Sequence, residues 1–197
     1  MRVVVLTLLV LFTGRLAAPA EALAQYHRAT DGIVVGGTLA AASSSTDLLT
    51  GGPELGGLIE IPMGDTLRLR GEAAVGFWHF NGHPQAAVAG SGMRRHRLTV
   101  SVLRSPNPPS PNWRLAGYAG GGAGVYLYRF PSRPNGGAWG IHGVAGVEYL
   151  LPTMRSRWLA GGEVQLHVMG QPKAPGDVAV IPMLSAHVSA VLKYRLP

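Results

Sequence analysis

The sequence predicts an all-β protein, an up-and-down antiparallel barrel of eight strands that crosses a membrane. Charged residues make up 14% of the chain, well below the roughly 25% of soluble domains. Glycine (28) and proline (15) together account for 43 of the 197 residues, which favours strands and turns over long helices. Apolar and polar side chains alternate through long segments, and a tilted strand needs only about 9–11 residues to span a bilayer.

The first 24 residues have the pattern of a secretory signal peptide. Arg2 supplies a positive start, residues 3–12 form an apolar run, and Ala22-Leu23-Ala24 fits a small-x-small cleavage site. The apolar run is too short to cross a bilayer as a helix. We therefore expect residues 1–24 to be removed and residues 25–197 to form one barrel domain, with an uncleaved N-terminal anchor as the alternative.

Eight strand-like segments follow the leader, separated by stretches rich in turn-forming residues. They are residues 32–41, 54–61, 67–78, 94–103, 113–130, 138–151, 158–169 and 178–196. The gaps between them tend to alternate between long and short, as the loops and turns of outer-membrane barrels do, although the proline-rich fourth gap is long for a turn. We expect exposed loops near residues 42–53, 79–93, 130–137 and 170–178.

The alternation leaves open which face of each strand points inward. In the stretch LRLRGEAAVGF, Leu67, Leu69 and Phe77 fall on one face, and Arg68 and Arg70 fall on the other. A soluble periplasmic lipid-binding barrel would bury the leucines, whereas a membrane barrel would turn them towards lipid. The many small residues on the polar faces favour the membrane barrel, because a narrow eight-stranded barrel has space for only a few long side chains inside.

The charged residues on the polar faces are expected to neutralise one another inside the barrel, since buried charges must be paired. The basic residues of this set are Arg68, Arg70, Arg95, Arg97, Arg114, Lys193 and Arg195, and the acidic ones are Glu60, Glu72, Glu148 and Glu163. Tyr118, Tyr126 and Tyr128 share the polar parity of a glycine-rich strand and can fill the space that its glycines leave. We therefore expect a filled lumen and no large pore.

Several aromatic residues lie near the ends of the predicted strands, on the apolar parity. They are Trp113, Trp139, Tyr149, Trp158 and Tyr194. Such placement is typical of the aromatic girdles that meet the lipid headgroups on either side of a membrane. In a soluble barrel, the same residues would close the core.

With its leader, its eight amphipathic strands and its final stretch HVSAVLKYRLP, the chain resembles the small outer-membrane β-barrel superfamily of Gram-negative bacteria, which includes OmpX, the OmpA membrane domain and opacity-type proteins. The resemblance implies an outer-membrane location, contact with the lipid of that membrane, and insertion by the barrel-assembly machinery. That machinery recognises an amphipathic final strand with an aromatic last residue. Leu192, Tyr194 and Leu196 have the right phase, but the chain ends in Pro197.

One group of residues could perform acyl transfer. His187 and Ser189 lie on the same face of the last strand, and Glu163 on the preceding strand could approach them. The arrangement is similar to the outer-membrane lipid A deacylases, which carry a His-x-Ser motif followed by Asn and a Glu further downstream. Here Ala190 follows, and no acidic residue comes after Ser189. We expect a hydrogen-bonding pair without catalysis, and a lipid hydrolase is the alternative.

Histidines and glycines suggest two further sites that we do not expect to form. Antiparallel pairing could place His142 opposite His167, with His187 nearby, but a metal site needs three or four converging ligands. His79 and His83, in a predicted loop, are weaker candidates. The glycine-rich segment GYAGGGAGVYLYR lacks the Lys-Ser/Thr of a phosphate-binding loop. We therefore expect no metal and no cofactor.

Composition narrows the remaining function classes. The chain has no cysteine, which removes disulfides, cysteine-based zinc sites and thiol chemistry. Its net charge of +7 is not gathered into a basic helix or patch, so we expect no nucleic-acid partner. We expect a monomeric outer-membrane protein with a structural or adhesive role, in which the exposed loops supply any surface for an extracellular ligand.

Overall fold

The computed structural model describes residues 32–45, 49–64, 66–80, 92–105, 115–129, 135–151, 157–170 and 182–197. They form β1 (Val34–Ser44), β2 (Leu49–Thr50), β3 (Pro53–Pro62), β4 (Leu67–Phe80), β5 (Gly92–Arg104), β6 (Leu115–Arg129), β7 (Gly136–Leu150), β8 (Trp158–Gly170) and β9 (Pro182–Arg195). The predicted leader, residues 1–24, lies outside these ranges. No helix in the described ranges is long and apolar enough to cross a membrane.

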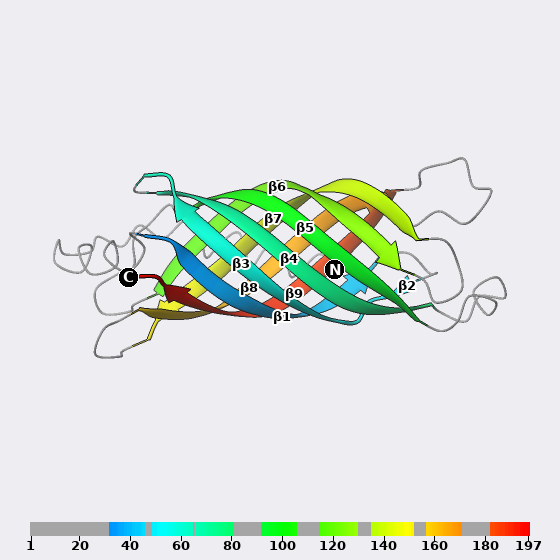
Figure 1. The fold of residues 1–197 in the computed structure, drawn as a ribbon, viewed down its shortest axis with the longest axis horizontal. Coiled ribbons are helices and arrows are strands. Elements are labelled where there is room, and N and C mark those ends of the chain that lie inside the picture. Colours follow the sequence, from blue (N-terminus) through cyan, green and yellow to red (C-terminus); the bar gives the residue numbers. More distant parts are fainter. Residues whose placement is uncertain are drawn as a thin grey trace, which may run out of the picture.

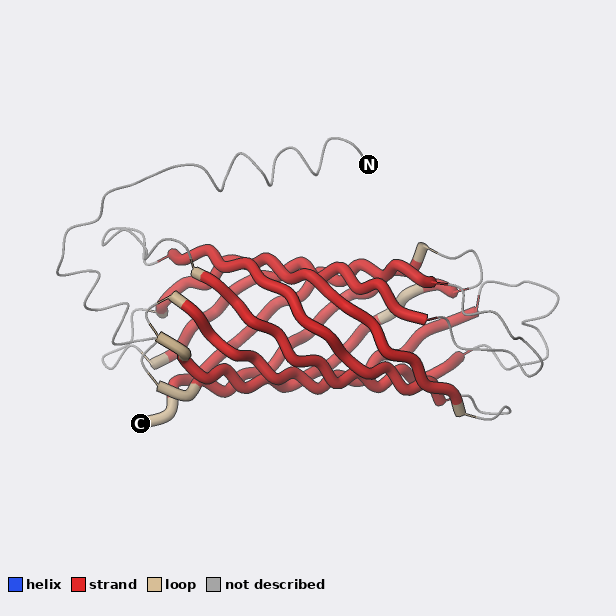
Figure 2. The backbone as a smooth tube through the Cα atoms, turned by 90° about the horizontal axis from the view of Figure 1, so that it is seen from above, coloured by secondary structure: helices blue, strands red, loops and turns tan. Residues whose placement is uncertain are grey.

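The eight long strands close into an up-and-down antiparallel barrel, which confirms the predicted fold (Figure 1). Each of the eight long strands pairs with the next long strand along the chain, and β1 closes the barrel by pairing with both β3 and β9. The short β2 pairs only with β4. The start of β1, the turn from β3 to β4 and the C-terminus share one end of the barrel (Figure 1). We call it the C-terminal end, after the chain end that lies there (Figure 2). We call the opposite end, to which the connections from β4 to β5 and from β8 to β9 belong, the loop end.

Two strand boundaries differ by more than two residues from those expected, and the other boundaries of the eight long strands lie within two residues of the prediction. The first barrel strand continues to Ser44 instead of residue 41, because Ala42, Ser43 and Ser44 pair in register with residues 185–187 of β9. Small and hydroxyl-bearing residues carry little strand signal of their own, so pairing with a distant segment decides the boundary. The last strand begins at Pro182, and the predicted residues 178–181 lie outside the described ranges.

The barrel wall is apolar outside and polar inside. Leu98 on β5 is 62% exposed, and Val100 and Leu166 also point outward, whereas Arg70 on β4 is 1% exposed and Arg68 is buried in the lumen. The alternation therefore has the sense predicted for a membrane barrel. A soluble barrel would have the opposite arrangement, with the leucines inside and the arginines in water.

Outward-facing aromatic residues lie at both ends of the apolar wall. Trp139, 78% exposed, is near the loop end of β7, and Tyr149 is near the C-terminal end of the same strand, with Trp158 and Tyr194 at that end of β8 and β9. Trp139 and Tyr149 are ten residues apart on one strand. At about 3.3 Å per residue and a strand tilt of about 40°, they are separated by roughly 25 Å along the barrel axis, the height of the apolar band of outer-membrane barrels. Trp113 lies outside the described residues.

Glycines in β6 let two strand backbones approach closely. A β-carbon added at Gly122 would lie 1.8 Å from the Val100 carbonyl oxygen, and one at Gly120 would lie 2.0 Å from that of Val102. Only glycine therefore fits at these positions. The three tyrosines of the same strand, Tyr118, Tyr126 and Tyr128, are fully buried in the lumen, as their parity predicts.

Candidate functional site

The buried charged residues and histidines of the described chain lie in the lumen, and the charged residues form two clusters. The Lys193 cluster, towards the C-terminal end, consists of Arg68, Arg70 and Lys193 with Glu60, Glu148 and Glu163. The Glu54 cluster, towards the loop end, consists of Arg95 and Arg97 with Glu54 and Glu72. Each cluster has equal numbers of cations and carboxylates, so each is neutral when fully ionised.

In the Lys193 cluster, each cation contacts two carboxylates. Arg68 Nη1 lies 2.9 Å from Glu60 Oε2 and 3.0 Å from Glu148 Oε1. Lys193 Nζ likewise lies 2.8 Å from Glu60 Oε1 and 2.9 Å from Glu148 Oε2. Arg70 Nη2 lies 2.6 Å from Glu60, while its other terminal nitrogen pairs with Glu163.

The ring of Tyr118 lies among the cations of this cluster. Lys193 Nζ is 4.6 Å from the ring centroid, and the guanidinium carbons of Arg68 and Arg70 are each 5.3 Å away. An aromatic face attracts cations at such distances. The tyrosine therefore fills space and also stabilises positive charge that is removed from water.

The Glu54 cluster links three strands, and Gln165 connects it to a fourth. Arg95 from β5 pairs with Glu54 from β3, and Arg97 Nη2 lies 2.6 Å from Glu72 on β4. Gln165 on β8 joins the second pair, because its Oε1 accepts from Arg97 Nη1 (2.6 Å) and its Nε2 donates to Glu72 Oε2 (3.1 Å). The charged groups thereby hold opposite walls of the barrel together.

Apolar and aromatic side chains fill the lumen next to both charge clusters. At the loop end, a loop-end plug is formed by Trp78, Met93, Tyr126, Tyr128, Met169 and Met183. Arg95 lies 4.1 Å from the Trp78 ring centroid, and Trp78 Nε1 donates to Glu54 Oε1 (3.1 Å), so the plug is continuous with the Glu54 cluster. Towards the C-terminal end, the buried side chains are Leu103, Tyr118 and Val144, with Leu150 packed on Leu159.

Three histidines form a column beside the Glu54 cluster. His142 lies directly opposite His167, as expected, and their rings stack with centroids 5.1 Å apart; the His167 and His187 centroids are 4.4 Å apart. Ser101 hydrogen-bonds to His142 (2.7 Å), and the Tyr126 hydroxyl to His167 Nδ1 (2.7 Å). Among the described residues, no group of three or more His, Cys, Asp or Glu side chains converges as a metal site would require.

Neither the hydrogen-bonding pair expected of His187 and Ser189 nor the alternative relay with Glu163 forms among the described residues. Glu163 pairs with Arg70, and Ser189 Oγ is buried without a hydrogen bond to any residue in the described ranges, although Glu163 and Ser189 are direct cross-strand neighbours. His187 Nε2 instead lies 2.8 Å from Ser185 Oγ. The register is as expected for Glu163, but Arg70 is the stronger partner for a buried carboxylate.

The residues Ser185, His187 and Glu54 have the order of a nucleophile, base and acid without the surroundings that catalysis needs. His187 Nδ1 lies 3.1 Å from Glu54 Oε2, but within the part of the chain that the structure describes neither atom makes a hydrogen bond. Arg95 Nη2 donates to the same Nε2 (2.9 Å) that would have to accept the serine proton. All three residues are at most 2% exposed, so no substrate reaches the hydroxyl in this state of the barrel.

Four of the residues singled out in the sequence lie outside both charge clusters or outside the described ranges. Arg195 is on the lumen face but half-buried at the C-terminal end, and it makes no ion pair with the described residues. Arg114 and His83 lie outside the described ranges, and His79 is exposed at the loop end of β4. Glu54 and Trp78 were not predicted as lumen residues, although each has the lumen parity of its strand: Glu54 lies on the same face of β3 as Glu60, and Trp78 on the same face of β4 as Arg70.

Comparison with solved structures relates this architecture to known proteins. Neisserial surface protein A (NspA) superposes with a TM-score of 0.56 at 13% sequence identity, covering 83% of this chain and 96% of that chain. Ail, the attachment invasion locus protein of Yersinia pestis, in complex with the heparin analogue sucrose octasulfate, superposes with a TM-score of 0.50 at 11% identity, covering 84% of this chain and 97% of that chain. The chain has the fold of the small outer-membrane β-barrels. No family model and no curated protein matches its sequence.

Proposed function

We propose that this chain is an outer-membrane protein whose filled barrel acts as a structural platform and whose loop end carries a recognition surface. One observation carries the proposal: the wall is apolar outside between two aromatic belts, while ten paired charges occupy the described lumen. An apolar surface that encircles a protein is rare in water, where patches rarely exceed a few hundred Å². In a bilayer, the same surface is in its preferred solvent.

The interior argues against the soluble lipid-binding alternative and against a pore. A barrel that carries lipid needs an apolar cavity, but this lumen contains two charge clusters and a histidine column. The plug at the loop end and the leucines towards the C-terminal end close off the space that water or solutes would use. We therefore propose a barrel without a large steady conductance.

The outer edge of the loop end supports a role in recognition. Arg94 and Arg129 are cross-strand partners on β5 and β6, both exposed, and neither forms an ion pair with a described residue. Like charges directly opposite one another repel, so an anionic group placed between them would be stabilised. The complex of Ail with a heparin analogue makes a sulfated polyanion a suitable test ligand.

Fractionation tests the location. The full chain, with residues 1–24, is expressed in a Gram-negative host, and the separated membranes are run on a gel with and without heating. We expect the protein in the outer-membrane fraction, with unheated protein migrating differently from heated protein. Recovery in the soluble periplasmic fraction without detergent would overturn the proposal. Insertion by the assembly machinery, a monomeric state and outer-membrane lipid as the surrounding solvent are parts of the same proposal.

Binding and conductance test the two further parts. Purified barrel in detergent is titrated with sucrose octasulfate, and we expect the affinity of an Arg94→Gln/Arg129→Gln variant to fall, with Arg104→Gln, an exposed arginine at the opposite end, as the control. Equal affinity of the unmodified barrel, the double variant and the Arg104→Gln control for sucrose octasulfate would contradict the proposed recognition surface. In planar bilayers, we expect no stable large channel, and a steady pore would contradict the filled lumen.

A further inference from the structure

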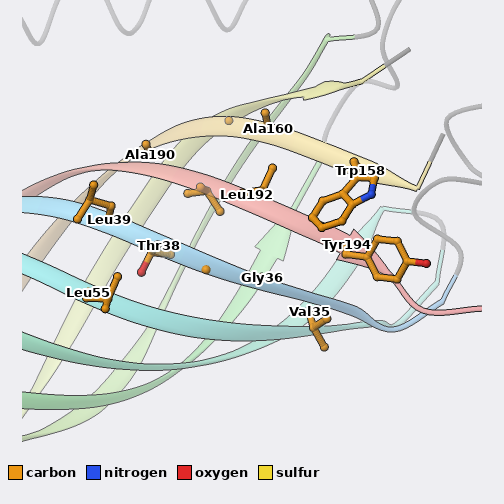
Figure 3. Close-up of a pocket in the computed structure, with 13 residues that line it drawn as sticks. Val35, Gly36, Thr38, Leu39, Leu55, Trp158, Ala160, Ala190, Leu192 and Tyr194 are labelled. Atoms are coloured by element: carbon orange, nitrogen blue, oxygen red, sulfur yellow. The ribbon is translucent and has the colours of Figure 1, made fainter. Parts of the chain in front are cut away.

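The outer wall contains an apolar groove on one side of the barrel. It has a volume of about 660 Å³, within the roughly 300–1,000 Å³ of small-molecule sites. It runs over the seam where β1 lies between β3 and β9, and reaches β8 (Figure 3). The groove exists because outward positions that carry leucine or valine elsewhere on the wall are small here: Gly37, Ala160 and Ala190.

Larger side chains surround this floor. Leu39 and Leu55 pair across β1 and β3 at one end of the groove, and Trp158 and Tyr194 pair across β8 and β9 at the other (Figure 3). Val35 opposite Tyr194 and Leu39 opposite Ala190 mark its length on β1, which is about 13 Å at roughly 3.3 Å per residue. Leu192 projects from the middle. The groove offers no hydrogen-bonding side chain along this length except Thr38, which is buried towards the lumen.

The end of the groove at the aromatic belt is different, because it carries a cation. Arg157, the residue before β8, donates from Nη1 to the Tyr194 hydroxyl (3.4 Å). This guanidinium makes no ion pair with any residue that the structure describes. Positive charge thus lies where the apolar groove meets the aromatic belt.

The groove is apolar along its length, and at one end it has an aromatic pair and the Arg157 guanidinium. These features match a ligand that has a hydrocarbon chain and an anionic headgroup. We propose that the groove binds one anionic phospholipid, with its acyl chains along Gly37 and Ala160 on the two sides of Leu192, towards Ala190, and its phosphate at Arg157. The hydrocarbon fills a hollow that would otherwise lose dispersion contacts, and the phosphate receives a charge-assisted hydrogen bond. The Trp158 and Tyr194 rings, whose centroids are 4.9 Å apart, cover the glycerol region between them.

This inference rests on the outer-membrane placement, and it adds a defined lipid site at the C-terminal end of the wall. The chemistry favours a lipid over a second copy of the chain. A barrel wall curves away on both sides of the groove, whereas a stable protein interface needs about 800 Å² per partner. Charge complementarity selects an anionic headgroup over a zwitterionic one, in which the ammonium group would meet Arg157.

Native mass spectrometry of the full barrel tests the site. The protein is released from mixed micelles containing phosphatidylglycerol and phosphatidylethanolamine with identical acyl chains, and retained lipid is counted. We expect one retained phosphatidylglycerol per barrel, in preference to phosphatidylethanolamine. In Arg157→Gln, this preference should fall about fivefold, the effect of losing one partly solvated charge contact, while Arg104→Gln at the same end should keep it.

A matched pair of glycine variants tests the groove itself. A β-carbon at Gly37 would lie 3.8 Å from the nearest atom, and one at Gly143, an outward-facing glycine on β7, would lie 3.9 Å from its nearest. Both positions therefore accept leucine without a backbone clash, but only Gly37→Leu fills the groove. We expect Gly37→Leu to lower lipid retention at least fivefold and Gly143→Leu to leave it unchanged, with both variants still heat-modifiable.

The outcomes separate this proposal from the previous one. Equal retention of both lipids by the unmodified barrel, or equal effects of Gly37→Leu and Gly143→Leu, would overturn the lipid site while leaving the membrane placement intact. A dimer that dissociates in Gly37→Leu would assign the groove to a second copy. Recovery of the protein in soluble form without detergent would instead contradict the proposed outer-membrane location.

Discussion

The Lys193 ammonium group lies 2.8 Å from the Glu60 carboxylate, although β9 and β3 do not pair with each other and are separated by β1. Glu60 also forms ion pairs with Arg68 and Arg70, so one carboxylate neutralises part of the charge of three cations. The closed barrel alone brings these four side chains together, because they come from β3, β4 and β9. The Lys193 cluster can therefore form only in the closed barrel, and its loss should lower the unfolding free energy of the whole fold.

Replacing Glu60 with glutamine should strongly destabilise the barrel. The variant keeps the shape of the side chain but leaves three buried cations with two carboxylates. Removing one partner of a buried pair usually costs about 3–5 kcal/mol. Urea titration of the barrel in lipid or detergent would measure the loss as a lower unfolding midpoint. Arg104→Gln, at an exposed position outside the clusters, serves as the control; equal midpoints for the two variants would show that Glu60 is dispensable.

A double substitution at Arg97 and Glu72 should be less harmful than either single one. These side chains are each other's nearest charged partners, at 2.6 Å. Arg97→Met leaves a buried carboxylate, and Glu72→Met leaves a buried guanidinium, whereas the double variant removes both charges from a low-dielectric site. A double-mutant cycle on unfolding free energies should therefore give a coupling of about 1–3 kcal/mol. Simple additivity of the two single effects would mean that the pair contributes nothing specific.

The sequence predicted the sense of the wall but not the partners in the lumen, and the reason is physical. Side-chain alternation has a period of two and is local, so Arg70 and Leu98 could be assigned to opposite faces without knowing any pairing. The contact of Glu54 with Arg95 and His187 depends on the register of several strands at once, and one-residue slips would change it. Glu163 shows this limit: its neighbour Ser189 was foreseen, but its partner Arg70 comes from β4.

Ser185 should not react as an activated serine. Its hydroxyl contacts His187 Nε2 at 2.8 Å, but Arg95 competes for the same nitrogen and the side chain is almost fully buried. We expect a fluorophosphonate reagent to leave the folded barrel unlabelled, and Ser185→Ala to change only stability, by about 1–3 kcal/mol for a lost buried hydrogen bond. Covalent labelling that disappears in Ser185→Ala, but not in Ser189→Ala, would contradict this and establish a nucleophile.

Two glycines on opposite faces should differ sharply in their tolerance of alanine. At Gly122, the added carbon would lie 1.8 Å from the Val100 carbonyl oxygen, so β5 and β6 would have to separate, whereas at Gly143 the nearest atom would be 3.9 Å away. We expect Gly122→Ala to prevent formation of the heat-modifiable barrel and Gly143→Ala to fold normally. If both variants folded with equal yield, the close approach of β5 and β6 would not be required.

Arg94 and Arg129 offer a prediction of increased stability. They face one another across β5 and β6 on the exposed side of the loop end, and the guanidinium carbon of Arg94 lies 5.9 Å from the Phe77 ring centroid. Arg129→Glu replaces a like-charged cross-strand pair with an opposite one, which should raise the unfolding free energy by about 0.2–1 kcal/mol in detergent at low salt. Arg129→Gln should give a smaller gain, and added salt should reduce both. In lipopolysaccharide-containing membranes, Arg129→Glu should instead be less stable than the unmodified barrel, because two arginines can bind a phosphate that a glutamate repels. A gain of equal size in detergent and in these membranes would show that no anion binds this pair.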